Sequence, residues 1–352
     1  LKNPVEPNIC TLESIQVDDN EIKRFLSQFN NKFSHNDLEK TLNQFKDAFN
    51  FGSLIKPYFE NGDKLRQEIL SKDFSKDIFL QFTKEVVIRV LDYSDYLSTK
   101  YHVLVTNPPY LGNNKMNKRL SDFAKKIYPD SKADLFSMFM ERSLSMTIKS
   151  GMIAMINMQS WMFLSSYEKL RLMVLRNSKL LNMAHIGPNG FDSIGGEVVS
   201  TTAFILQNHE NTDHQGDFLR LVEGKSEAEK SSLINKIIAN RNCGLFYKIS
   251  SSEFNKIEGS PFLYWLSENY RKVFESEKTL SNISEIKQGL ATCNNDKFLR
   301  LWFEVSNCNS NFYCKEREIT KEKPQKWFPY NKGGGYRNWY GNNNFLVNWK
   351  ND

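Results

Sequence analysis

Tyr101-His102-Val103-Leu104-Val105-Thr106-Asn107-Pro108-Pro109-Tyr110 is the stretch that decides the fold of this 352-residue chain. Residues 101–106 form a short apolar and β-branched run, which predicts a buried strand. The two prolines end the run because they cannot donate hydrogen bonds to a sheet ladder. Ligands of open α/β sheets bind at the carboxyl ends of the strands. The position of residues 107–110 therefore indicates a functional loop, with a plain strand-ending turn as the alternative.

The segments on either side of this strand predict an α/β domain. Residues 1–97 show the apolar spacing of three and four that is typical of helices, with a break near 72–75. Helices and strands then alternate: helices are expected at 133–149 and 167–175, and strands at 151–158, 180–186 and 197–206. This order predicts a sheet that is parallel at first and antiparallel at its end.

Composition and charge limit the classes of function. The chain is 40% hydrophobic and 25% charged, which is ordinary for a globular protein, and its net charge of +6 permits a nucleic-acid partner without requiring one. No apolar run approaches the ~20 residues of a membrane helix, and no secretory signal opens the chain. Five scattered cysteines and five isolated histidines show no metal-ligand spacing. We therefore expect a cytoplasmic protein with no metal site and no membrane contact.

Asn107, Pro108, Pro109 and Tyr110 together can activate an amine on an aromatic ring. Such an amine is a poor nucleophile because its lone pair is delocalised into the ring. Two acceptors on the same NH2 group push the nitrogen toward tetrahedral geometry, and the Asn107 side-chain oxygen and the Pro108 carbonyl are the candidates. Proline fixes φ and so holds both acceptors in place. Tyr110 offers a flat face on which an extruded base can stack.

The tetrapeptide resembles the catalytic motif of amino-methyltransferases that use S-adenosylmethionine. Because some protein and rRNA methyltransferases share it, it indicates the reaction and not the substrate. The run Asp134-Leu135-Phe136-Ser137-Met138-Phe139-Met140-Glu141 resembles the next helix of adenine-N6 DNA methyltransferases. That resemblance implies that Phe139 lines the base pocket, with core packing as the alternative. His185-Ile186-Gly187 and residues 198–202 resemble the motif whose aromatic stacks on the flipped adenine, which implies this role for Phe191.

The last quarter of the chain is rich in tryptophan, asparagine and positive charge. Residues 277–352 hold twelve Lys/Arg against eight Asp/Glu. Residues 287–300 and 326–341 look like the start of the target-recognition domain of BREX phage-defence adenine methyltransferases and their restriction-modification relatives. Lys326, Lys332 and Arg337 are the candidate DNA-phosphate contacts; the alternative is a packed domain with solvated charges. Cys293 stands where the family pattern leads us to expect a glycine turn.

The resemblance implies part of a Rossmann-like, S-adenosylmethionine-dependent methyltransferase domain, with an N-terminal helical segment and a C-terminal mixed α/β target-recognition domain. The expected boundaries are a helical segment at 1–97, the catalytic part at 98–210, a helical connector at 211–278 and the recognition region at 279–352. We expect a polar loop at 207–216, where the catalytic part meets the connector, and helices at 226–239 and 261–274 within the connector. Double-stranded DNA is the implied partner, together with other proteins of a defence system.

The cofactor site is expected outside this chain. The family needs a glycine-rich turn after its first strand and an acidic residue closing the second. Gly52 and Gly62 are the glycines before residue 101, and neither follows an expected strand. We therefore expect the motif upstream of Leu1, and a chain that alone binds S-adenosylmethionine weakly and is inactive. Three alternatives stay open: a degenerate cofactor site within 1–97, a non-catalytic DNA-binding or assembly module, and a protein or rRNA N-methyltransferase.

Overall fold

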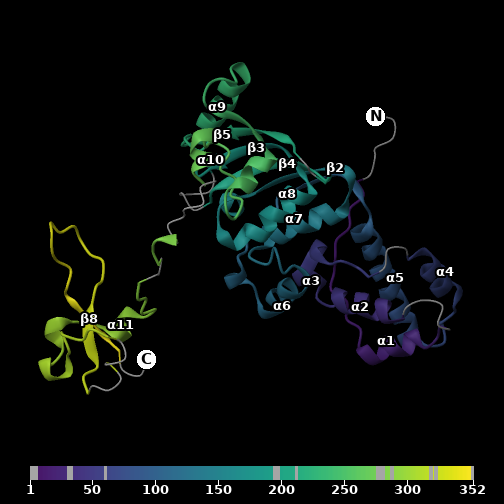
Figure 1. Cartoon of the computed structure of the whole chain (residues 1–352). Helices are drawn as coiled ribbons and strands as arrows, with labels where there is room; N and C mark the ends of the chain where they lie inside the picture. Colours follow the sequence, from purple (N-terminus) through teal and green to yellow (C-terminus); the bar gives the residue numbers. More distant parts are fainter. Residues whose placement is uncertain are drawn as a thin grey trace. The chain divides into compact units, whose positions relative to one another are not determined.

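The computed structural model describes most of the chain in two compact units, Leu1–Ser276 and Glu277–Asp352 (Figure 1). The described residues are 7–29, 35–58, 62–192, 199–210, 213–274, 282–285, 289–316, 320 and 324–349.

Helices dominate the region before the first strand, as the spacing of apolar residues predicts. In the described part these are α1 (Asp19–Leu26), α2 (His35–Phe45), α3 (Ala48–Phe51), α4 (Asp63–Ser71) and α5 (Ile78–Ser98). The predicted break near 72–75 is confirmed, because α4 ends and α5 begins on either side of it. Asp18 and Asp77 cap α1 and α5 with their side chains. The apolar faces of these helices enclose a core of their own, which includes Phe25, Phe45 and Val90.

The first unit contains a six-stranded sheet in the order β1-β2-β4-β3-β5-β6. Its strands are β1 (Tyr101–Thr106), β2 (Thr147–Met158), β3 (Lys179–Gly187), β4 (Thr201–Gln207), β5 (Gln215–Arg220) and β6 (Phe246–Ser250). β1 pairs with β2 in parallel, β4 is antiparallel to both β2 and β3, and β3 is parallel to β5. The carboxyl ends of β1, β2, β3 and β5 therefore share one edge of the sheet. The α/β prediction is confirmed, and residues 107–110 lie at that edge.

Two strands were not expected from the sequence. β5 begins inside the segment that was expected to be a polar loop. The prediction of a helical connector over 211–278 is also wrong, because this region contributes β5 and β6 to the sheet. The pattern of β5 is hard to recognise because only alternate side chains face the core: Gly216 and Phe218 are buried, whereas Asp217 and Leu219 are not.

The helix expected at 261–274 is wrong over its first half. Only Glu268–Phe274 is helical (α10). Phe262 and Tyr264 are fully buried in the main core, and the Phe262 N–H donates to the Met162 carbonyl at 2.9 Å. Core packing of these aromatic rings overrides the local helical pattern.

The two faces of the sheet differ. α7 (Leu135–Met146) and α8 (Glu168–Asn177) pack on one face, where Phe136, Leu170 and Met183 join a buried cluster (Figure 1). The other face carries residues of α9 (Glu227–Ala239) at its β5 end and exposed side chains at its β1 end, where Val105 is 75% exposed. The expected burial of strand 101–106 is therefore wrong, because β1 lies at the end of the strand order and pairs with β2 alone among the described strands. α6 (Lys118–Ile127) packs in a separate small cluster with α7.

The second unit is small and has its own sheet. Its strands β7 (Leu299–Leu301), β8 (Trp327–Tyr330) and β9 (Phe345–Asn348) are ordered β7-β9-β8 and antiparallel. Leu299, Phe328 and Val347 form its core. Before β7, α11 (Asn295–Phe298) is capped by Asn294. Cys293 has a φ of 55°, so it adopts the left-handed conformation that favours glycine although it carries a side chain.

Candidate functional site

The loop after β1 holds its four residues in different environments. Pro108 is buried and Asn107 is exposed at the end of the strand. The Tyr110 hydroxyl donates to the Asn107 side-chain oxygen at 3.2 Å and also lies 3.5 Å from the Ile156 carbonyl of β2. Burial raises the pKa of the Tyr110 hydroxyl, so it keeps its proton for this bond. Tyr110 therefore holds the Asn107 side chain next to its hydroxyl.

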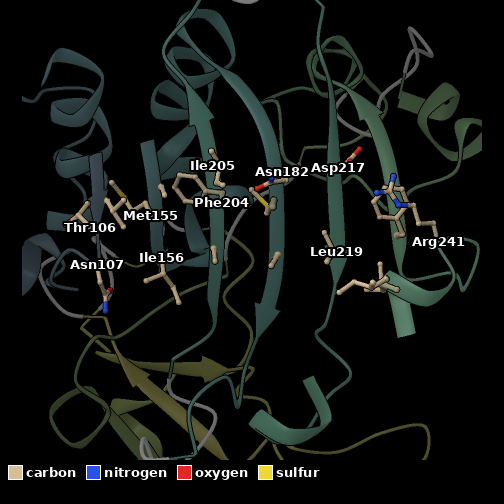
Figure 2. Close-up of a pocket in the computed structure, with 18 residues that line it drawn as sticks. Thr106, Asn107, Met155, Ile156, Asn182, Phe204, Ile205, Asp217, Leu219 and Arg241 are labelled. Atoms are coloured by element: carbon tan, nitrogen blue, oxygen red, sulfur yellow. The ribbon is translucent and has the colours of Figure 1, made fainter. Parts of the chain in front are cut away.

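A cavity lies on each side of this loop. Asn107 lines a largely apolar cavity of about 830 Å³ on the open face of the sheet, which reaches across Ile205 toward Arg241 (Figure 2). Tyr110 lines a second, more polar cavity of about 980 Å³ together with Asp134 and Tyr167. The loop thus presents an amide to one cavity and an aromatic ring to the other.

Asp134 fixes the backbone directly after the loop. Its buried carboxylate accepts from the Leu111 N–H at 2.9 Å and from the Phe136 N–H, and it forms a capping box with Ser137 at the start of α7. Burial raises the pKa of the Asp134 carboxyl, while the backbone donors oppose this rise. No role for Asp134 was expected from the sequence. The signal that could have revealed one is an aspartate in the N-cap position of an apolar helix.

Aromatic rings connect Tyr110 to the core. The Tyr110 ring meets Phe136 edge to face at a centroid distance of 6.2 Å, and Phe136 lies 5.6 Å from the ring of Tyr167. The Tyr167 hydroxyl has its pKa raised to about 12 by burial. Phe139, the predicted pocket residue, is partly buried and packs against two hydrophobic clusters. Phe136 is therefore the α7 residue with a ring contact to Tyr110.

Phe191 follows β3 and lies at the same sheet edge as the loop, because β1 and β3 run in the same direction. It is half-buried. Gly187 ends β3 with a φ of 74°, and a Cβ there would lie 2.9 Å from Val222, so this turn requires glycine. Residues 193–198, including the expected start of strand 197–206 and part of the 198–202 motif, lie outside the described residues.

A buried histidine ties the strand ends together. The Nε2 of His185 lies 2.6 Å from the Gln159 side-chain oxygen, and its Nδ1 lies 2.9 Å from the Tyr264 hydroxyl. Because the Gln159 oxygen only accepts, Nε2 carries the proton and Nδ1 accepts from Tyr264. Burial lowers the pKa of His185 to about 4, and Arg220 and Lys230 act in the same direction. His185 is thus a neutral link between the ends of β2 and β3.

The predicted DNA contacts all lie in the second unit. Lys326 is half-buried just before β8. Lys332 and Arg337 belong to the loop between β8 and β9, with the Lys332 ammonium 4.7 Å from the centre of the Phe345 ring and Arg337 exposed. Residues 286–288 of the expected recognition motif lie outside the described residues.

The described residues ahead of β1 contain helices but no strand, so they offer no strand and glycine-rich turn to cradle an adenosine. Across the described ranges, no three His, Cys, Asp or Glu side chains group as metal ligands. No described helix has both the length and the apolar character to cross a membrane.

Sequence similarity shows the family of this chain. The Eco57I restriction-modification methylase family model matches residues 9–191, just over half of the chain. The chain therefore belongs to this family, and the predicted family resemblance is confirmed.

Similar proteins point to the same group. The chain is 39% identical over 309 residues to the adenine-specific methyltransferase PglX of Lacticaseibacillus casei (strain Zhang), covering 85% of this chain and 25% of that relative. It is 39% identical over 273 residues to the adenine-specific methyltransferase BrxX of Escherichia coli O9:H4 (strain HS), covering 76% of this chain and 21% of the relative. The chain thus spans a quarter or less of the length of these relatives.

Among solved structures, a modification subunit of a putative type I restriction enzyme from Vibrio vulnificus YJ016 is similar at a TM-score of 0.35. It is 15% identical, with 55% of this chain and 49% of that chain covered.

Proposed function

We propose that this chain forms the base-binding and target-recognition part of a site-specific DNA adenine-N6 methyltransferase. The observation that carries the proposal is the geometry at the end of β1. There, an exposed Asn107 amide is oriented by Tyr110 at 3.2 Å and is followed by a buried proline. In this proposal residues 98–210 are catalytic, 279–352 belong to the recognition domain, and 1–97 and 211–278 support them.

Asn107 and Pro108 act on the amine of the extruded adenine. The Asn107 oxygen uses one lone pair to accept from Tyr110 and has a second lone pair for one N–H of the amine. The Pro108 carbonyl accepts the other N–H. Pro109 limits the conformations of the loop, so both acceptors stay in place before the reaction. The two bonds draw the nitrogen toward tetrahedral geometry and make its lone pair available for attack.

The aromatic residues hold the base. Because Asn107 and Tyr110 line different cavities, the proposed place of the adenine is over the loop itself, with its amine at Asn107 and one face on Tyr110. The edge contact with Phe136 keeps the plane of the Tyr110 ring fixed. Phe191 is the proposed partner for the other face, and Phe139 the proposed pocket lining on α7. Asp134 acts through the backbone, because its bond to the Leu111 N–H holds the residue next to Tyr110.

S-adenosylmethionine, which methylases of this family generally use, supplies the methyl group when bound. The described residues ahead of β1 do not fit the adenosine of this cofactor, so we assign it no residues in this chain. We propose double-stranded DNA as the partner, contacted by Lys326, Lys332 and Arg337, and other proteins of a phage-defence or restriction-modification system as further partners. A cytoplasmic location accompanies this role.

The test is methyl transfer by the natural full-length protein. With labelled S-adenosylmethionine and adenine-containing duplex DNA, we expect label in adenine N6, and a loss of at least a hundredfold in rate for Asn107→Ala, the scale known for removal of one oriented polar group in an active site. Parallel reactions with RNA and with protein separate the other methyltransferase classes. Normal adenine methylation by Asn107→Ala would refute the proposal.

A second candidate is a non-catalytic DNA-binding module, favoured by the lack of a strand before β1 among the described residues. Calorimetry on this chain with duplex DNA and with S-adenosylmethionine addresses it. DNA binding without cofactor binding, combined with a full-length protein that transfers no methyl group, would favour the module.

A further inference from the structure

The loop between β8 and β9 has an unusual composition. Residues 331–344 (Asn-Lys-Gly-Gly-Gly-Tyr-Arg-Asn-Trp-Tyr-Gly-Asn-Asn-Asn) hold three aromatic residues, two cations and five asparagines, and no acidic residue. Figure 1 shows this loop as the long yellow excursion from the small sheet. Its side chains are therefore free of local negative charge.

The aromatic rings of this loop point into solvent. Trp339 is fully exposed, and Tyr336 and Tyr340 are 90% and 83% exposed. Large aromatic residues in a folded unit normally contribute to the core, as Trp327 and Phe328 do here. Three exposed rings within five residues constitute a surface for binding.

The backbone at Trp339 adopts an unfavourable conformation. Trp339 has a φ of 65°, a left-handed conformation that bulky side chains rarely adopt. Such strain persists when the surroundings enforce it and is concentrated at functional positions. The Tyr340 N–H donates to the Asn338 carbonyl at 2.7 Å, which closes the turn around Trp339.

Contacts within the loop hold its shape. The Asn342 side chain donates to the Gly335 carbonyl at 3.1 Å and so joins the two arms. Gly334 lies against the Asn342 side chain, on the opposite arm of the loop. On the outgoing arm, Gly341 packs against the Arg337 side chain. The rings are thus presented on a constrained turn.

We propose that residues 331–344 form a stacking loop for DNA, in which Trp339 lies against the face of an unstacked base. This proposal rests on the DNA partner proposed above and adds a binding mode to it. An aromatic side chain reaches a base face only where that base has lost a neighbour, as at a distorted or mispaired step. Lys332 and Arg337 contact the flanking phosphates, and asparagine side chains offer hydrogen bonds to the backbone or base edges. The absence of acidic residues in the loop favours this polyanion over a basic protein partner.

The experiment compares binding of two DNAs by the natural full-length protein. One is a fully paired random-sequence duplex and the other is the same duplex with one mismatched base. We expect the wild type to prefer the mismatched DNA, and Trp339→Ala to weaken binding to it by roughly tenfold, within the range known for base–aromatic stacking. Trp339→Phe should retain most of the preference. Trp302→Ala removes another exposed tryptophan of the same unit and is the matched control, with no expected change.

The outcomes separate this inference from the proposed function. Equal binding of both DNAs by wild type and Trp339→Ala would overturn the stacking loop, even if the protein methylates adenine. Loss of a protein partner from Trp339→Ala with unchanged DNA binding would overturn it as well. A Trp339-dependent preference in a protein that transfers no methyl group would leave the loop standing and refute the proposed function.

Discussion

Acidification from pH 7 to pH 5 is expected to destabilise the first unit through His185. This ring is buried and neutral, and its two nitrogens form hydrogen bonds with Gln159 and Tyr264. Protonation would place a charge in this buried site and remove the acceptor that Tyr264 uses. The positive charges of Arg220 and Lys230 also disfavour protonation of the ring, because both lower the pKa of His185.

The size of this loss of stability follows from the pKa of His185 in the folded chain and in the unfolded chain. The pKa of His185 falls from 6.5 in the unfolded chain to about 4 in the folded one. Because the folded pKa is depressed, the stabilisation is fully present above pH 6.5 and is lost as the pH falls toward 4. At about 1.36 kcal/mol for each tenfold change in proton affinity, the full loss is about 3 kcal/mol, of which about 2 kcal/mol is lost by pH 5.

The assay is urea unfolding at a series of pH values, followed by far-ultraviolet circular dichroism at a wavelength that reports the helices of the first unit. His185→Gln keeps hydrogen-bonding capacity without a titrating ring, so its free energy of unfolding should change about 2 kcal/mol less between pH 7 and 5 than that of the wild type. The wild type and the variant must be compared directly, because the pKa of His214 is also lowered by burial. Parallel pH dependences for the two proteins would refute the reasoning.

Three further changes test the site and its supports. Asp134→Ala should lower the free energy of unfolding by about 2 kcal/mol, measured in urea, because a helix cap and the acceptor for the Leu111 N–H are lost together, whereas Asn should restore most of it. Arg142→Ala should destabilise by about 3 kcal/mol, since this buried guanidinium donates to the Leu97 carbonyl at 2.7 Å; an unchanged melting curve would contradict this. Arg337→Ala should reduce the salt dependence of DNA binding by about one counterion, and an unaltered slope would exclude a phosphate contact.

Much of the fold could be predicted from local pattern alone. The β1 run and its two prolines predicted a strand with a functional loop at its end, and the charged break at 72–75 separated two helices that the structure also separates. β5 escaped prediction because its buried residues are only Gly216 and Phe218, and β6 because it is a short strand at the far edge of the sheet. Both segments form strands because they pair with residues that are distant in the sequence, and a single sequence does not reveal such pairing.

The candidate site likewise contains some contacts that the sequence could predict and others that it could not. Asn107 and Tyr110 could be paired in advance because they are three residues apart in a rigid turn, and the structure brings them together. Asp134 is 23 residues from Leu111, so its bond to that N–H depends on how α7 returns to the sheet. The sequence could mark Asp134 as a helix cap but not as a support of the loop.

The position of Asp134 changes how the loop after β1 should be understood. Prolines restrict the backbone at 108 and 109, yet they leave the direction of the chain beyond Tyr110 undetermined. That direction is set where Leu111 bonds Asp134 and Leu135, at the first turn of α7. The same turn contains Phe136, whose ring contacts Tyr110. One helix start therefore positions both the backbone and the ring of the loop, so a change at Asp134 should reduce the rate of methyl transfer more than it weakens DNA binding. Equal effects on both would mean that Asp134 supports the fold and not the orientation of the loop.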